Sequence, residues 1–215
     1  SLRSPMLSFA NTDMAFKDNI LIAGSYHGFN IYELDNDGIP NLISSVVCPG
    51  GQGDVSIVGD LLIMSVEENR SRLDCGLEGV NSDSSPERFR GIRIFDISNL
   101  SKPKQVGAVQ TCRGSHTHSV VSTTKDNKII VYNSGTGRVR DNEEKAECFG
   151  WDGGGSSYFS IDVIEIPINN PSDSRIVKSP KVFMDLETGN VAGLWRGGDH
   201  GCLLYTSDAA DERLG

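Results

Sequence analysis

A stretch of roughly 65 residues recurs three times along this chain, and this recurrence restricts the fold more than any other feature of the sequence. Each copy holds a short apolar run, then a turn that contains a proline, then a second apolar run. The three copies of the first run are Gly28–Leu34, Gly91–Ile97 and Ser160–Ile166. Such a repeat indicates one structural unit that is built three times, each unit packing against its neighbours.

Four short strands account for each copy. In the second copy we expect them at Asp54–Val58, Leu61–Val66, Gly91–Ile97 and Gln105–Thr111, separated by turns rich in Gly, Asn, Asp and Pro. No stretch of this length keeps a helical apolar period. Four-stranded units packed radially make a β-propeller, whereas a β-sandwich would not predict the internal repeat. The expected fold is therefore all-β: a partial β-propeller of about three four-stranded antiparallel blades.

The repeat also sets the expected domain organisation. Residues 1–201 are expected to form an incomplete propeller, with blades at roughly 8–50, 51–113 and 114–186 and the start of a fourth at 187–201. Residues Cys202–Glu212 resemble the in-frame translation of a transposase mosaic-end sequencing adapter. We therefore expect residues 202–215 to be a non-native tail and the natural protein to continue beyond this chain, with a total number of blades that the sequence leaves open.

The second copy of the repeat carries a family resemblance. Gly91–Ser98, followed by Pro103, resembles the LVIVD repeat of bacterial extracytoplasmic propellers. Four loops make the chain similar to an uncharacterised branch of that family, over roughly residues 8–201. The resemblance implies a propeller that is secreted or periplasmic, with no established activity. The four loops are Val47–Ser56, Arg72–Gly76, Cys112–His118 and Leu194–Gly201.

Charge and hydropathy exclude two classes of partner. The net charge is −9 and no cluster of Lys and Arg offsets it, which argues against binding to nucleic acid or to an anionic membrane. No apolar run reaches the roughly 18 residues that a membrane span requires. The partner is therefore expected to be a protein or a small ligand of unknown identity.

In a propeller, the links between blades and the loops between the second and third strands share one face. On this scheme every histidine of the chain lies on that face, together with two aspartates that stand beside glycines. A charged loop at residues 67–74 lies there too, either as a clamp for a polar substrate or as a solvated loop whose charges pair internally. The candidate ligand-binding residues are Asp54, Arg72, His116, His118, Asp199 and His200.

A subset of these residues suggests a metal site. His116 and His118 are two positions apart on a strand, which points both imidazoles to the same side, and His200 would join them at the channel mouth. The cofactor would then be a divalent or transition metal of unknown identity. The competing interpretation is that these histidines hydrogen-bond backbone carbonyls around glycine-rich turns.

Four cysteines remain when the tail is set aside. Cys48 and Cys112 end the fourth strands of the first two blades, and Cys75 and Cys148 lie in the long loops of the blades that follow. This arrangement predicts the disulfides Cys48–Cys75 and Cys112–Cys148, each joining adjacent blades. Four free thiols or a thiolate metal site are the alternatives. Disulfides persist only in oxidising compartments, so the chain is expected to be secreted, periplasmic or on the cell surface.

These observations lead to two functional hypotheses. The first is an extracytoplasmic propeller that binds a ligand or a protein through its loop face without catalysis. The second is a metal-dependent propeller enzyme that uses His116, His118 and His200. The sequence has no nucleophile elbow, P-loop or dinucleotide fingerprint.

Overall fold

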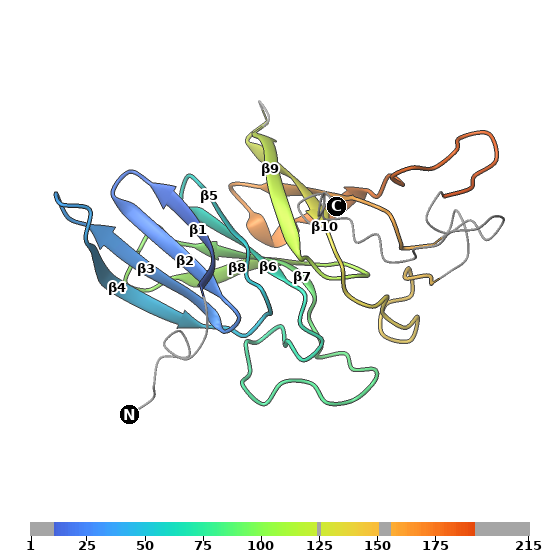
Figure 1. Ribbon diagram of the computed structural model, residues 1–215, viewed down its shortest axis with the longest axis horizontal. Helices are drawn as coiled ribbons and strands as arrows, with labels where there is room; N and C mark the ends of the chain where they lie inside the picture. Colours follow the sequence, from blue (N-terminus) through green and yellow to red (C-terminus); the bar gives the residue numbers. More distant parts are fainter. Residues whose placement is uncertain (1–10, 124–125, 151–155, 192–215) are drawn as a thin grey trace, which may run out of the picture.

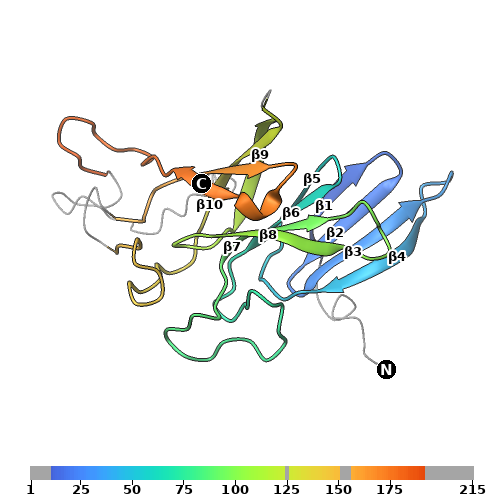
Figure 2. The same cartoon turned by 180° about the vertical axis from the view of Figure 1, so that it is seen from behind.

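The computed structural model describes residues 11–123, 126–150 and 156–191. They form three separate antiparallel sheets of four strands each. The sheets follow one another in chain order, with the second between the first and the third (Figures 1 and 2). The all-β fold and the three four-stranded blades are therefore confirmed. The expected tail at 202–215 and nearly all of the expected fourth blade lie outside the described residues.

Within every sheet the strands lie in the order of the sequence, because each is joined to the next by a hairpin or a loop. The first sheet contains β1 (Asn11–Lys17), β2 (Ile20–Ser25), β3 (Gly28–Leu34) and β4 (Pro40–Val47). The second contains β5 (Val55–Val58), β6 (Leu61–Val66), β7 (Gly91–Asp96) and β8 (Lys104–Gln110). The third contains β9 (Thr117–Thr123), β10 (Lys128–Ser134), β11 (Asp162–Pro167) and β12 (Arg175–Lys178), with the short 3-10 helix η3 (Pro171–Asp173) before its last strand.

The second sheet is buried on both faces, which explains why its strands mix strict alternation with continuous apolar runs. On one face Leu62 and Met64 of β6 pack against residues of the first sheet such as Phe29. On the other face Ile63 of β6 and Ile94 of β7 pack against the third sheet. Because successive side chains of a strand point to opposite faces, one strand supplies both cores.

A glycine starts the third strand in the first two blades because no side chain can be accommodated there. Gly28 and Gly91 have φ angles of +135° and +147°. A Cβ atom at either position would lie 2.0 Å from a carbonyl oxygen of the fourth strand. The third copy has Ser160 at this position, and its strand β11 begins two residues later, at Asp162.

The links between blades and the loops after each second strand meet at one end of the sheets, which we call the loop face (Figure 1). Backbone hydrogen bonds join them: the Cys48 N–H donates to the His27 carbonyl at 2.8 Å, and the Ser115 N–H donates to the Val66 carbonyl at 2.9 Å. The loop face is therefore a continuous surface formed by several segments of backbone rather than a set of separate tips.

Two disulfides reinforce the loop face, and they join the pairs that the sequence predicts. Cys48 is bonded to Cys75, and Cys112 is bonded to Cys148. Each disulfide connects the link that leaves one blade to the long loop of the next blade, the β6–β7 loop (67–90) or the β10–β11 loop (135–161). In the part of the chain that the structure describes, no helix has the length and apolar character to cross a membrane.

Candidate functional site

A cavity of about 240 Å³ opens on the loop face where the first strands of the three blades come together. Figure 1 shows β5 lying between β1 and β9. The residues that line the cavity come from all three blades. All of the lining residues are polar or charged. They are Thr12, Asp13, Gln52, Asp54, His116, Thr117, Ser134 and Thr136.

Two aspartates hold the first strands in place at this cavity. The Val55 N–H donates to Asp13 Oδ2 at 2.8 Å, and the His118 N–H donates to Asp54 Oδ2 at the same distance. The same contact thus occurs at both junctions between blades. It satisfies an N–H group of an edge strand and places each carboxylate at the rim of the cavity.

His118 lies beneath the cavity and does not open into it. Its side chain has no exposed surface, and its Nδ1 lies 3.1 Å from Asp54 Oδ2. The same Nδ1 is 2.8 Å from the hydroxyl of Ser65, which in turn is 2.7 Å from the hydroxyl of Ser115. These contacts make His118 a buried anchor for the Asp54 carboxylate.

The two carboxyl groups at the rim are hydrogen-bonded to each other and titrate differently. Burial raises the pKa of Asp13, and the nearby Asp54 carboxylate raises it further. Burial would also raise the pKa of Asp54, but hydrogen bonds and charge attraction from His118, with a hydrogen bond from Asp13, outweigh it and lower this pKa to about 2. Asp54 is therefore the stronger acid of the two.

His116 is the imidazole that faces the cavity. Its Nδ1 lies 2.8 Å from Glu67 Oε2, and the hydroxyl of Thr136 donates to the same carboxylate oxygen at 2.9 Å. The His116 side chain keeps 28% of its surface exposed. The β6–β7 loop therefore supplies, through Glu67, the group that orients this ring.

The structure brings together some of the predicted site residues and separates others. Asp54 and His116 line the cavity and His118 supports it, whereas Asp199 and His200 lie outside the described residues. The prediction of a metal site depends on His200 and stays a prediction. Within the described ranges no three His, Cys, Asp or Glu side chains are grouped so that they could hold a metal ion.

Arg72 does not line this cavity, because carboxylates of its own loop surround its guanidinium. Asp74 Oδ2 lies 2.8 Å from Arg72 Nη2, Glu87 Oε2 lies 2.6 Å from Nη1, and Glu78 Oε1 lies 3.2 Å from Nε. Hydrogen bonds from Arg72 hold the pKa of Asp74 well below its ordinary value. Of the two interpretations that the sequence left open, the internally paired loop is the one observed.

Asp13 is one of the lining residues that sequence reasoning missed. It occupies the position in the first blade that Asp54 occupies in the second, since each caps the first strand of the following blade. A residue-by-residue alignment of the three copies, extended from the third strands to the first strands, would have found it. The hydroxyl-bearing residues Thr117, Ser134 and Thr136 carry no comparable signal.

No protein-family model and no curated protein matches the chain. Among solved structures, the chain is similar to a protein from Lactobacillus plantarum, with a TM-score of 0.38 and 16% identity over 80% of this chain and 55% of that one. It is also similar to the computationally designed Ika4 protein, with a TM-score of 0.34 and 11% identity over 79% of this chain and 92% of that one. The chain thus spans about half the length of the Lactobacillus protein, and similarities at this level carry no functional conclusion.

Proposed function

We propose that this chain belongs to an extracytoplasmic propeller of the LVIVD-repeat type and binds a small polar ligand at the mouth of its channel. The observation that carries the proposal is the 240 Å³ cavity, where polar side chains from three blades line one rim. Ligand sites in repeat architectures form where several units present side chains to a shared surface. In a broader form of the proposal, the ligand is a protein that binds to the same loop face.

The chemistry of the rim favours a ligand that donates hydrogen bonds. Asp54 is ionised, so its carboxylate accepts hydrogen bonds and donates none. Gln52 and Thr136 add groups that can donate or accept. Hydroxyl groups of a sugar or polyol, or a small ammonium group, match such a rim. The volume of about 240 Å³ lies just below the roughly 300–1,000 Å³ of pockets that hold drug-sized molecules.

The two disulfides support the extracytoplasmic part of the proposal. Disulfides form and persist in secreted, periplasmic and cell-surface proteins and are rare in the reducing cytoplasm. The pairs Cys48–Cys75 and Cys112–Cys148 both lie at the loop face, where they hold the long loops beside the proposed site.

The alternative, a metal-dependent enzyme, has less support from the described residues. The Nδ1 of His116 is already engaged by Glu67, and the Nδ1 of His118 by Ser65 and Asp54. The His118 side chain is also fully buried, and its Nε2 has no hydrogen-bond partner among the described residues, so only a metal held beneath the rim could reach that nitrogen.

A thermal-shift experiment tests the proposal with probes of the expected chemistry: glucose, glycerol and ethanolamine at millimolar concentration. A ligand that binds the folded state raises the melting temperature in proportion to the logarithm of its concentration. We expect at least one probe to raise it, and Gln52→Ala or Thr136→Val to abolish the rise. Thr123→Val, at the far end of β9, is the control. A chain that responds to none of the probes, or variants that respond as the parent does, would contradict the proposal.

A further inference from the structure

A second cavity of about 470 Å³ lies on the loop face, between the β6–β7 loop and the β10–β11 loop. It shares no lining residue with the channel mouth. Five arginines and three carboxylates line it, so its wall is positively charged in a chain whose net charge is −9. Such a local reversal of charge marks a place where the chain can attract an anion.

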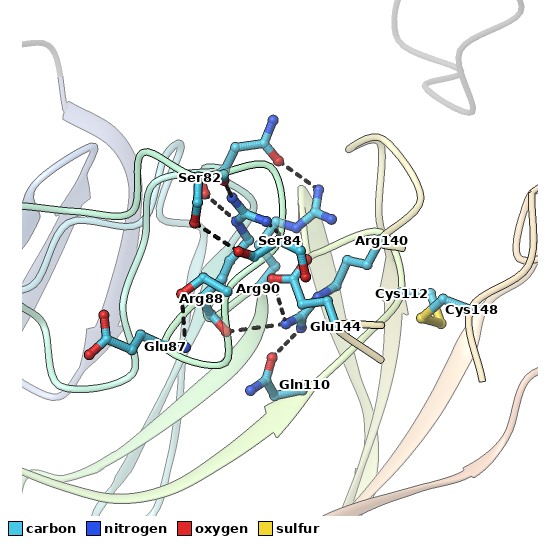
Figure 3. Close-up of polar contacts among 12 residues, drawn as sticks. Ser82, Ser84, Glu87, Arg88, Arg90, Gln110, Cys112, Arg140, Glu144 and Cys148 are labelled. Atoms are coloured by element: carbon cyan, nitrogen blue, oxygen red, sulfur yellow. Dashed lines mark hydrogen bonds and ion pairs between the residues drawn. A yellow bond between two sulfur atoms is a disulfide. The ribbon is translucent and has the colours of Figure 1, made fainter. Parts of the chain in front are cut away.

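Three of the arginines are buried, which is rare for a charged residue unless it is paired. The exposed fractions of Arg88, Arg90 and Arg140 are 7%, 2% and 4%. Figure 3 shows the three side chains together with Glu144, whose side chain is only 1% exposed. Three buried cations therefore lie around one buried carboxylate, which contacts two of them directly.

Arg88 and Arg140 are the two cations that Glu144 neutralises. The Glu144 carboxylate lies 2.9 Å from Arg88 Nη1 and 3.1 Å from Arg140 Nη2. Arg88 also donates to backbone carbonyls of its own loop, those of Asn69 at 2.7 Å and Asp83 at 2.9 Å among them. The guanidinium of Arg88 is thus used to hold the two loops together.

Arg90 has no comparable partner. Its Nη1 donates to the neutral side-chain oxygen of Asn69 at 2.8 Å. Its buried Nε has no hydrogen-bond partner among the described residues, and the same is true of the Nε of Arg140. Burial, and then the positive charge of Arg140, lower the pKa of Arg90 to about 10. The charge of Glu144 acts in the opposite direction, but no direct ion pair to Arg90 is seen among the described residues. A buried guanidinium without a direct ion pair is costly, and an anion in the adjoining cavity would reduce that cost.

The geometry points to a binding site for a small organic molecule that carries an oxyanion, with Arg90 as its principal ligand. The planar guanidinium donates two parallel hydrogen bonds to a phosphate, sulfate or carboxylate group, which is why arginine is favoured at such sites. A cavity of about 470 Å³ falls in the range of small-molecule pockets, roughly 300–1,000 Å³, and leaves room for more than an inorganic ion.

The Cys112–Cys148 disulfide holds this cavity in its observed shape. It joins Cys148, which follows the segment with Arg140 and Glu144 in the β10–β11 loop, to Cys112 of the link between β8 and β9 (Figure 3). The Arg140 N–H also donates to the Cys112 carbonyl at 3.1 Å. Because the segment is fixed before a ligand arrives, less conformational entropy is lost on binding. Reduction of this disulfide is therefore expected to weaken the binding of an anion.

Calorimetric titration of the whole chain with inorganic phosphate, sulfate and acetate tests this inference, with sodium chloride at equal ionic strength as the control for screening. We expect phosphate or sulfate to bind. We expect Arg90→Gln to raise the dissociation constant at least about tenfold, because the anion loses its buried charge partner. Arg175→Gln is the matched control, since Arg175 is 59% exposed and pairs with Glu165 outside the cavity. That variant is expected to bind as the parent does.

A stability measurement separates a ligand-binding role of Arg90 from a structural one. Without an added anion, Arg90→Gln is expected to be at least as stable as the parent, because it removes an uncompensated buried charge. Phosphate is then expected to raise the melting temperature of the parent and not that of the variant. Arg90→Lys, which keeps the charge and loses the planar fork, is expected to bind phosphate more weakly than the parent.

Three results would overturn the inference: no heat with any oxyanion, unchanged binding in Arg90→Gln and Arg90→Lys, or loss of stability in both variants with and without phosphate. A response to acetate alone would assign a carboxylate ligand. Thr136→Val, at the first cavity, is expected to leave phosphate binding intact. The anion site and the proposed polar-ligand site can therefore be refuted independently of each other.

Discussion

The carboxylate of Asp54 accepts a hydrogen bond of 2.8 Å from the backbone N–H of His118 and joins the first strands of two neighbouring blades. Asp13 makes the same contact with Val55 one junction earlier. The first strand of each blade is an edge strand, so the N–H groups on its free side need a partner from outside the sheet. One acidic position in the repeat therefore orders the blades and also supplies the polar rim of the channel mouth.

Replacing this carboxylate should loosen the junction. Asp54→Ala is expected to lower the free energy of unfolding by about 2 kcal/mol, because hydrogen bonds to an ionised group from the His118 N–H and the Thr117 hydroxyl are lost. Urea denaturation followed by circular dichroism measures the change. Asp60→Ala is the control, since Asp60 is 67% exposed and its pair with Lys17 is worth less than about 1 kcal/mol. Equal losses in the two variants would refute the role of Asp54.

Unfolding at low pH should depend on the same pair of carboxyl groups, Asp13 and Asp54. The pKa of Asp54 falls from 3.8 to about 2 on folding, so Asp54 stabilises the fold above the higher value, and this contribution is lost as the pH falls from about 4 to 2. The raised pKa of Asp13 acts in the opposite direction, favouring the fold while Asp13 is protonated. We expect the melting temperature of Asp54→Asn to fall less steeply over that range than that of the parent. Parallel profiles would show that another group controls acid unfolding.

Glu144 should be essential to the packing of the two long loops. Glu144→Gln leaves Arg88 and Arg140 buried without their shared counter-charge and is expected to cost about 3 kcal/mol or more. Chemical denaturation measures this loss. Glu143→Gln, at the exposed neighbouring position, is expected to change stability by less than about 0.5 kcal/mol. A Glu144→Gln variant as stable as Glu143→Gln would show that the buried arginines need no carboxylate.

The disulfides predict a defined pattern of thiol chemistry. Alkylation of the unreduced chain is expected to leave Cys48, Cys75, Cys112 and Cys148 unlabelled, and digestion is expected to yield two cross-linked peptide pairs. Removing either disulfide should cost about 3 to 4 kcal/mol when only the lost restriction of the unfolded chain is counted, because the paired residues are 27 and 36 apart. If mass spectrometry detected the alkylating label on all four cysteines of the unreduced chain, the support for an extracytoplasmic location would be lost.

Much of this molecule can be derived from its sequence because the repeat encodes it locally. The nearly continuous apolar run in Leu61–Val66 specifies a strand with two buried faces. The glycine at Gly91 is required by a backbone angle that other residues avoid. The cysteine pairing also follows, because cysteines at equivalent positions of successive repeats must lie at equivalent places in successive blades.

The sequence did not reveal which charged groups meet, and only the tertiary structure decided this. Arg88 and Glu144 are 56 positions apart, on two irregular loops whose paths no periodicity describes. Arg72 was predicted as a ligand contact, and only the structure shows that three carboxylates of its own loop surround it. Backbone hydrogen bonding and apolar burial depend on short-range patterns of residues, and these patterns are visible in the repeated sequence. The pairing of long charged side chains depends on distances set only when separate loops pack together, and for that reason the arginine cavity is visible in the fold alone.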